Sequence, residues 1–263
     1  MQRQIELIGA AWGLGGADPA CGDAPAVLAP LVAARLGGDH SCAGGTWSGV
    51  ARTLQEKSAG SLGLLWIDAH MDSHTPGTSH TGRLHGMPLA WLLGQDDDPL
   101  YGLASGVVEA RNVCIVGVRS FEPEEAARLA RLGVRVFFMD EIRRRGLAPV
   151  LAEALAIVSA RTAAFGISID LDVVSAEEVP HVGTPVRDGM SSAALSAALD
   201  GIGADPRLAA LELVEYSPRL DAEGRSARVA VELLAAALCG RGGGKSGGRP
   251  GEDPQVAADA IHR

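Results

Sequence analysis

The chain has 263 residues, of which 47% are hydrophobic and 21% are charged, and its formal net charge is −9. This composition excludes a disordered or fibrous chain, and the negative charge disfavours nucleic acid as a partner. The longest apolar stretches fall short of the roughly 18 residues of a membrane span and the N-terminus does not resemble a secretory signal, so we expect a cytoplasmic protein that does not bind membranes.

Short β-type runs alternate along the chain with longer Ala- and Leu-rich runs of helical periodicity. This alternation predicts an α/β fold with a mainly parallel sheet that helices cover on both faces. The expected strands are residues 5–10, 61–68, 112–118, 134–139, 164–172 and 208–216. The expected helices are residues 24–35, 46–58, 86–94, 122–132, 147–160, 191–202 and 225–239.

We expect residues 1–240 to form one domain and the Gly-rich residues 241–263 to form a flexible tail. The glycine cluster "WGLGGADPACG" follows the first expected strand, as a dinucleotide-binding loop would. Asp18, however, occupies the place of the third glycine of that motif. A nucleotide-dependent oxidoreductase is therefore a distant alternative.

The second expected strand runs directly into polar residues in the segment "LLWIDAHMDSH", residues 64–74. Asp68, His70 and Asp72 occupy alternate positions, so their side chains point the same way in an extended chain. A single aspartate after a strand is more commonly a helix cap or a turn residue. The D-x-H-x-D pattern as a whole, at the edge where open α/β sheets bind their ligands, indicates a metal site.

Two other segments carry the same kinds of side chain. The strand expected at 164–172 ends with Asp170 and Asp172, and "GGDHS" contains Asp39 and His40. Carboxylates brought together would repel one another unless cations neutralise them. Carboxylate oxygens mixed with imidazoles suit two ions of Mn²⁺ or a similar borderline metal better than Ca²⁺, and the absence of cysteine ligands argues against structural zinc. Bridging aspartates would hold such ions about 3.5 Å apart with an ionisable water between them.

Six segments together resemble a known family. They are "GGDHS", "WIDAHMDSHTP", "LHGMP", "SIDLDVV", "VGTPV" and "VEYSP". Their order and approximate spacing resemble the ureohydrolase family, and most closely its arginase branch, from about residue 5 to residue 240. The resemblance implies a three-layer α/β/α domain with a binuclear manganese centre, in which a metal-bound hydroxide cleaves a guanidino group to urea and an amine.

The resemblance also assigns metal ligands to six residues. One manganese would be bound by His40, Asp68, Asp72 and Asp170, and the other by His70, Asp68, Asp170 and Asp172. Asp68 and Asp170 would therefore bridge the two ions.

Four residues fall at positions with a catalytic or supporting role in the family. His85 corresponds to a proton-shuttling histidine, although it would also fit as an ordinary loop residue. Glu215 corresponds to the acid that holds the guanidinium, although a strand-end carboxylate in a surface ion pair would look the same. Thr184 would support that glutamate or serve as a turn hydroxyl, and Asp172 would pass a proton to the departing amine.

Four further residues, expected to bind the rest of the substrate, depart from the arginase pattern. His74 replaces an asparagine, Thr81 a serine, Arg83 an asparagine and Glu122 an aspartate. Thr81 still offers a hydroxyl, and Glu122 offers a carboxylate of longer reach for an ammonium group. Arg83 and His74 add positive character that suits a carboxylate, although His74 would equally fit as a loop residue. These residues favour an amino acid or guanidino acid over agmatine.

The N-terminal part of the chain is shortened. Fewer than 30 residues separate the first expected strand from "GGDHS", whereas arginases carry a longer segment there. We expect an edge element of the sheet to be missing or remodelled, and the strand before "GGDHS" to be cut to "VAARL". A misplaced His40 would weaken one metal site and lower the activity while the fold survived.

The expected function is therefore a manganese amidinohydrolase that converts L-arginine to L-ornithine and urea. One alternative is a hydrolase of another guanidino or formimino compound, such as guanidinobutyrate, formiminoglutamate or agmatine. Another is a catalytically weak metal-binding protein that senses a cationic metabolite. The resemblance also implies a homo-oligomer, either a trimer or a hexamer.

Overall fold

A computed structural model of the chain describes residues 35–36, 38–95 and 106–239. In this part of the chain six strands form one sheet in the order β1-β6-β5-β2-β3-β4, and every neighbouring pair is parallel. The strands are β1 (Arg35–Leu36), β2 (Leu62–Ile67), β3 (Val113–Val118), β4 (Arg135–Phe138), β5 (Ala164–Asp170) and β6 (Leu208–Val214).

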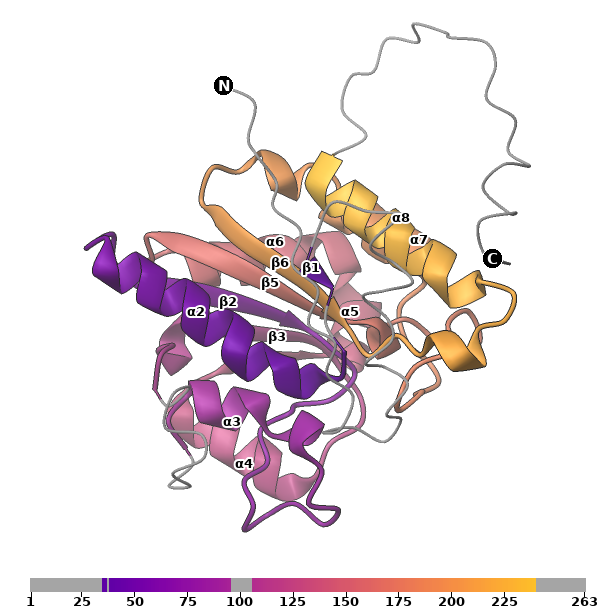
Figure 1. The fold of residues 1–263 in the computed structure, drawn as a ribbon, viewed down its shortest axis with the longest axis horizontal. Coiled ribbons are helices and arrows are strands. Elements are labelled where there is room, and N and C mark those ends of the chain that lie inside the picture. The colour runs from indigo at the N-terminus through magenta and orange to yellow at the C-terminus, as the bar shows by residue number, and fades with distance from the viewer. Residues whose placement is uncertain (1–34, 37, 96–105, 240–263) are drawn as a thin grey trace, which may run out of the picture.

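Helices cover both faces of this sheet (Figure 1). They are α2 (Ala43–Glu56), α3 (Pro88–Leu92), α4 (Pro123–Leu132), α5 (Met139–Arg145), α6 (Leu147–Ser159), α7 (Ser192–Leu199) and α8 (Arg225–Cys239). One hydrophobic core lies between the sheet and α2, α3 and α4, and a second lies between the sheet and α5 to α8. The expected three-layer α/β/α fold with a parallel sheet is confirmed.

The strand β2 shows why the middle of the sheet is apolar without interruption. All six of its residues are buried. Leu64 and Trp66 pack into the core under α2, whereas Leu65 and Ile67 pack into the opposite core. Alternate residues of a strand face opposite sides, so a strand with helices on both sides needs apolar residues at every position.

The helix α4 begins and ends where its sequence signals predict. Pro123 occupies the first turn, and the side chains of Glu122 and Glu125 form a reciprocal capping box with the backbone. Gly133 ends the helix with a φ of 77°, a conformation that glycine adopts at little cost. The capping box also fixes the two glutamates close together.

Gly166 in β5 makes room for the fully buried indole of Trp47 on α2. A Cβ atom at position 166 would lie 2.0 Å from the Trp47 ring. The Trp47 Nε1 atom donates a hydrogen bond of 2.7 Å to Glu212 Oε1 on β6. The glycine therefore lets α2 approach the sheet closely at the strands that carry the site.

Several element boundaries differ from those expected. The strand expected at 164–172 stops at Asp170, because Leu171–Val173 turn into a short 3-10 helix. The prediction of a helix at 24–35 is wrong at its C-terminal end, because Arg35 belongs to the strand β1, which pairs with β6. The helix α5 was not expected at all. The strand expected at 5–10, the rest of the 24–35 helix and the tail at 241–263 lie outside the described residues.

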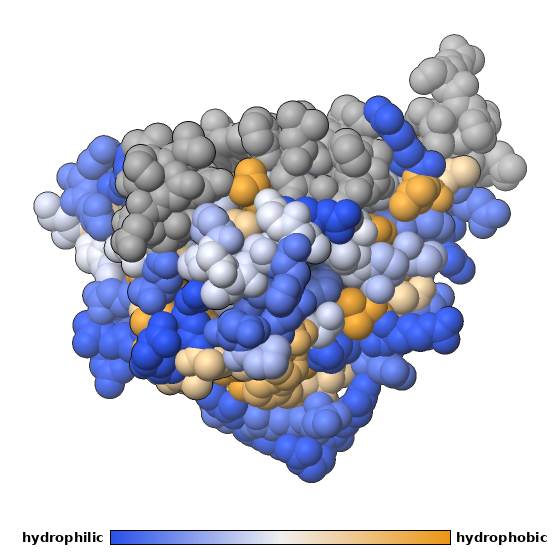
Figure 2. All heavy atoms as spheres, turned by 90° about the horizontal axis from the view of Figure 1, so that it is seen from below, coloured by the Kyte–Doolittle hydropathy of each residue, from blue (hydrophilic) through white to orange (hydrophobic). Residues whose placement is uncertain are grey.

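The surface carries few exposed hydrophobic side chains. Among the described residues, Phe121 and Leu220 are the large hydrophobic residues that stay exposed. On the face shown in Figure 2, hydrophilic residues predominate and hydrophobic ones appear in small areas. None of the described helices has the length and apolar character needed to cross a membrane.

Candidate active site

The order of the strands brings distant acidic residues to one edge of the sheet. The register of β2 and β5 places Asp68 beside Asp170, one position beyond the last paired residues of β2. On the other side of β5, the strand β6 ends directly before Glu215. The neighbouring strand β1 leads toward His40, and Gly38 O accepts a 2.9 Å hydrogen bond from the Glu215 amide. These are the carboxyl ends of parallel strands, where such sheets bind ligands.

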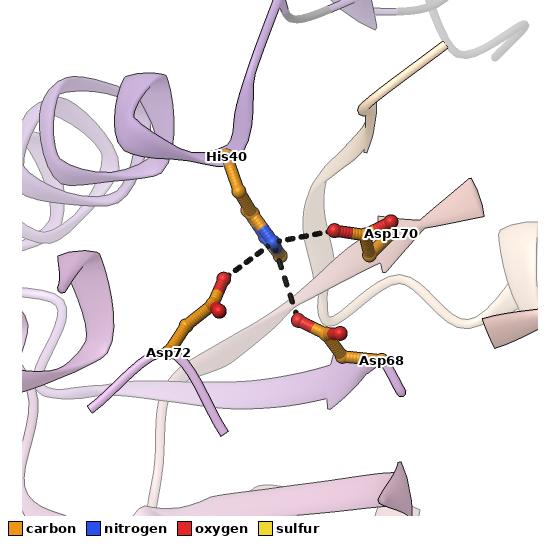
Figure 3. A group of neighbouring side chains, drawn as sticks. All are labelled: His40, Asp68, Asp72 and Asp170. Atoms are coloured by element: carbon orange, nitrogen blue, oxygen red, sulfur yellow. Dashed lines mark hydrogen bonds and ion pairs between the residues drawn. The ribbon is translucent and has the colours of Figure 1, made fainter. Parts of the chain in front are cut away.

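His40 lies at the centre of a first group of candidate metal ligands (Figure 3). Its Nδ1 atom is 2.9 Å from Asp72 Oδ2, 3.1 Å from Asp170 Oδ2 and 3.3 Å from Asp68 Oδ2. All four side chains are buried. One imidazole nitrogen with three carboxylates is a suitable ligand set for a divalent cation. The displacement of His40 considered in the sequence analysis is therefore not seen.

Neighbouring side chains fix the orientation of the His40 ring. The ring stacks on Trp66 with 4.2 Å between the ring centroids and an angle of 11° between the planes. On its far side, His40 Nε2 lies 2.9 Å from Ser168 Oγ, and Ser168 in turn donates to Glu212 Oε1 at 2.7 Å. A hydrogen bond at one ring nitrogen sets the tautomer and direction of the other, so Nδ1 faces the carboxylates.

A second group of candidate ligands contains Asp68, His70 and Asp172. His70 Nδ1 lies 3.0 Å from Asp172 Oδ2 and 3.6 Å from Asp68 Oδ1. Asp68 therefore belongs to both groups: its Oδ2 faces His40 in the first group, and its Oδ1 faces His70 in the second. Asp170 belongs to the first group, and its Oδ1 accepts the amide of Asp172 at 2.8 Å. The bridging role expected for Asp68 fits this geometry, whereas that of Asp170 stays a prediction.

The electrostatics of these groups suit a cation. Burial, reinforced by the charge of Asp68, raises the pKa of Asp72 to about 6. Burial, with Asp172 and Asp68 nearby, raises the pKa of Asp170 well above its ordinary value. In addition, Asp172 Oδ2 is buried, and its 3.0 Å contact with His70 Nδ1 lacks the geometry of a hydrogen bond. Crowded carboxylates that retain protons give them up to a divalent cation, so the residues present fit a metal centre.

Asp72 and Glu215 are held in a backbone conformation that residues other than glycine rarely adopt. Their φ angles are 47° and 68°. Asp72 is kept in place by the hydrogen bond from Leu89 N to Asp72 O, at 2.9 Å. Such strain persists where the surroundings over-determine the conformation, and it is concentrated at functional sites.

The two residues expected to handle the guanidinium and its protons are in direct contact. Glu215 Oε1 lies 3.1 Å from His85 Nδ1 and accepts the backbone N–H of His40 at 2.8 Å. Burial alone would raise the pKa of Glu215, but the hydrogen bond with His85 lowers it below its ordinary value. Burial alone would lower the pKa of His85, but Glu215 raises it. Glu215 is thus a buried anion beside the first ligand group.

A cavity of about 190 Å³ opens above the ligand groups. It is lined by candidate metal ligands, by His85 and by all of the residues expected to bind the rest of the substrate. The lining consists of His70, Asp72, His74, Ser79, His80, Thr81, Arg83, His85, Gly86, Ser120, Glu122, Glu125, Asp170 and Thr184.

At one wall of this cavity His74 lies between two glutamates. Its Nε2 atom is 3.0 Å from Glu122 Oε2 and 3.3 Å from Glu125 Oε2. Burial raises the pKa of Glu125 to about 8. Burial would raise the pKa of Glu122 as well, but the contact with His74 lowers it. His74 therefore contacts acidic groups of the protein, and its expected role toward a substrate carboxylate stays a prediction.

Several residues of the site were not expected from the sequence. Glu125, Ser120, Ser79 and His80 line the cavity, and Ser168 supports His40 from below. The signal for Glu125 was present, because a glutamate three residues after the N-cap position predicts a capping box and hence proximity to Glu122. The other four occupy ordinary turn or strand positions that carry no such signal.

Comparisons with known proteins agree on one family. The model of the "Arginase family" matches residues 26–240. The arginases of Brevibacillus brevis and Bacillus caldovelox are 41% and 37% identical to this chain over 208 and 207 residues, and each alignment covers 78% of this chain and 67% of the relative.

Among solved structures, an arginase from Bacillus subtilis superposes with a TM-score of 0.82 at 29% identity, covering 90% of this chain and 98% of that one. A formimidoylglutamase from the same species superposes with a TM-score of 0.68 at 28% identity, covering 78% of this chain and 60% of that one.

Proposed function

This chain belongs to the arginase family, and we propose that it is a binuclear manganese amidinohydrolase that converts L-arginine to L-ornithine and urea. The family relationship makes it a hydrolase of C–N bonds in linear amidines. The observation that carries the proposal for this chain is the pair of His/Asp groups that share Asp68 beside the buried carboxylate of Glu215.

The first group would hold one ion through His40, Asp68, Asp72 and Asp170. The second group would hold the other through Asp68, His70 and Asp172, and the family resemblance adds Asp170 to it as a bridging ligand. When bound, Mn²⁺ would supply Lewis-acid activation of a water molecule near neutral pH.

Glu215 is the residue that would orient the substrate. Its carboxylate stays ionised because the contact with His85 lowers its pKa. A planar guanidinium pairs well with a buried carboxylate through charge-assisted hydrogen bonds. Since Glu215 is fixed to the backbone of His40, it would hold the guanidinium carbon against the metal ligands in a reactive position.

Two residues would move protons. Asp172, buried on the floor of the site, would pass a proton to the departing amine. His85 lies on the wall of the cavity with its side chain 14% exposed, so it would exchange protons between Glu215 and solvent. Thr184, which lines the same cavity, would support Glu215 in binding the guanidinium.

Other residues that line the cavity suit the amino acid part of arginine. Glu122, with its lowered pKa, would accept from an ammonium group. Thr81 and Arg83 would donate to a carboxylate. Agmatine lacks the carboxylate, so it would not make these contacts, and water would satisfy the exposed donors instead.

A formimino acid is the second candidate substrate. The likeness to a formimidoylglutamase favours it. Arg83 favours it as well, because its guanidinium would pair with the additional carboxylate of such a substrate. It would use the same metal ligands, and the two candidates differ in the product released.

The test begins with metal analysis of the purified protein, followed by assays with and without added Mn²⁺. Urea release from arginine, guanidinobutyrate and agmatine is measured beside formamide release from formiminoglutamate. We expect the highest kcat/KM on arginine and dependence on Mn²⁺. Preference for another compound would reassign the substrate, and a metal-loaded protein without any turnover would favour the sensor alternative.

A further inference from the structure

The loop that carries Thr184 is paired with the turn that carries Glu215. Ser217 N donates to His181 O at 3.0 Å, and Gly183 N donates to Glu215 O at 3.3 Å. Between these bonds, residues 182 and 216 form an antiparallel bridge. The position of the Glu215 backbone therefore depends on where residues 181–184 lie.

Side chains fasten this pair of segments to the start of helix α8. Asp221 is buried, and its Oδ1 lies 2.9 Å from His181 Nδ1. The other oxygen accepts the hydroxyl of Tyr216 at 3.2 Å. The same carboxylate accepts the backbone N–H groups of Arg225 and Ala227 at 2.8 and 2.9 Å. One carboxylate thus joins residue 181, residue 216 and the first turn of α8.

A second contact strengthens the joint. His181 Nδ1 also lies 3.0 Å from Ser226 Oγ, and Ser226 is fully buried in the first turn of α8. The helix itself packs into the core through several buried residues. The Thr184 loop and the Glu215 turn are therefore attached to the helix α8 rather than to another loop.

The need for such an anchor comes from the conformation of Glu215. Its φ of 68° is unfavourable for a residue with a side chain and persists only when neighbours hold it. Before residue 215 the chain is held by the bond to Gly38 O, and after it by the pairing with residues 181–183. Release of the second restraint would let the Glu215 carboxylate turn away from His40.

We propose that His181 and Asp221 are positioning residues that clamp the Thr184 loop and the Glu215 turn to α8, so that the Glu215 carboxylate stays aimed at the guanidinium. The inference rests on the proposed function for the identity of the bound group. It does not involve the metal ligands, which contact neither residue of the clamp in the described structure.

His181→Ala removes the side-chain link from the Thr184 loop to Asp221 and Ser226 without emptying the core, because the His181 side chain is 23% exposed. We expect unchanged metal content and a kcat/KM on the best guanidine that falls by about tenfold or more, since small misplacements of positioning groups are costly. His181→Asn should restore most of the loss, because its amide nitrogen occupies the place of Nδ1. Arg228→Ala is the matched control, because it removes a 2.9 Å bond to Glu223 O at the same end of α8.

Amide hydrogen exchange tests the clamp without any need for turnover. In His181→Ala the amides of Gly183 and Ser217 should exchange about tenfold faster or more, with the β2 amides unchanged. Unchanged exchange at both amides would overturn the clamp, and so would faster exchange spread evenly over the whole protein. If the amides respond as expected but no guanidine is hydrolysed even by the unaltered protein, the proposed function fails and the clamp stands.

Discussion

The backbone N–H of His40 donates a 2.8 Å hydrogen bond to Glu215 Oε1, while the ring of the same histidine faces three aspartates. One residue thus sets the distance between a candidate metal-binding group and the candidate guanidinium-binding carboxylate. Because Glu215 belongs to neither ligand group, a substitution that keeps its acceptor oxygen should act on the substrate and leave the ligand groups in place.

Glu215→Gln should keep the metal content and lower kcat/KM for the guanidine by about 10²-fold. The amide still accepts from His40 N, but it no longer carries the charge that pairs with a guanidinium, and a charge-assisted hydrogen bond contributes about 1.5–3 kcal/mol. Metal analysis and steady-state kinetics on the same preparation check this. Loss of metal from the variant would place Glu215 among the ligands instead.

Two single variants, Asp68→Asn and Asp170→Asn, test which aspartates bridge the two metal ions. Asp68 contacts ligands of both groups, so its amide variant should lose both ions and all activity. If Asp170 bridges as the family resemblance implies, Asp170→Asn should behave in the same way. Retention of one ion per chain in Asp170→Asn, measured by elemental analysis, would limit Asp170 to the first group.

His85→Asn should lower kcat by about 10²-fold with little change in metal content, because a positioned proton-transfer group contributes about 10²–10⁴-fold. His85 contacts Glu215 but none of the candidate ligands at hydrogen-bond distance in the described structure. Added imidazole should recover part of the rate. Absence of recovery, combined with a raised KM, would indicate that His85 only holds Glu215.

Glu125 should make the stability of the protein depend on pH. Burial raises its pKa from an ordinary 4.5 to about 8, so the folded protein binds this proton more tightly than the unfolded chain. Its stabilising contribution is therefore complete below pH 4.5 and is lost as the pH rises toward about 8. Urea unfolding should show a decline over this range that is smaller in Glu125→Gln.

The control for this measurement is Glu124→Gln, which alters an exposed neighbour on the same helix. It should keep the pH dependence of the original chain. His74, Glu122 and Asp72 also act on Glu125 and are unchanged in both variants. Equal declines in the Glu125 and Glu124 variants would show that another group carries the effect.

Gly166→Ala should destabilise the fold by about 1–3 kcal/mol or more, because its Cβ atom would overlap the Trp47 ring in a filled core. Gly49→Ala in α2 is the matched control. Nothing lies within 4 Å of its Cβ atom, and alanine should stabilise an exposed helix position by up to about 1 kcal/mol. Thermal unfolding of the two variants should therefore shift in opposite directions, and a shared direction would contradict the packing.

The sequence by itself determined the local features of this protein. An uninterrupted run of apolar residues placed β2, and the D-x-H-x-D spacing put Asp68, His70 and Asp72 beyond its end. The proline, acids and glycine around α4 predicted its limits. These features are local because they depend on backbone geometry repeated over a few residues.

Only the tertiary structure decided which strand tips meet. The placement of β5 between β2 and β6 brings Asp170 between Asp68 and Glu215. His40 and Glu215 are 175 residues apart, and His74 and Glu122 are 48 apart, so no local pattern links either pair. Such contacts depend on strand order and on which face each side chain occupies, and both are set by packing of the whole sheet between its two helical layers.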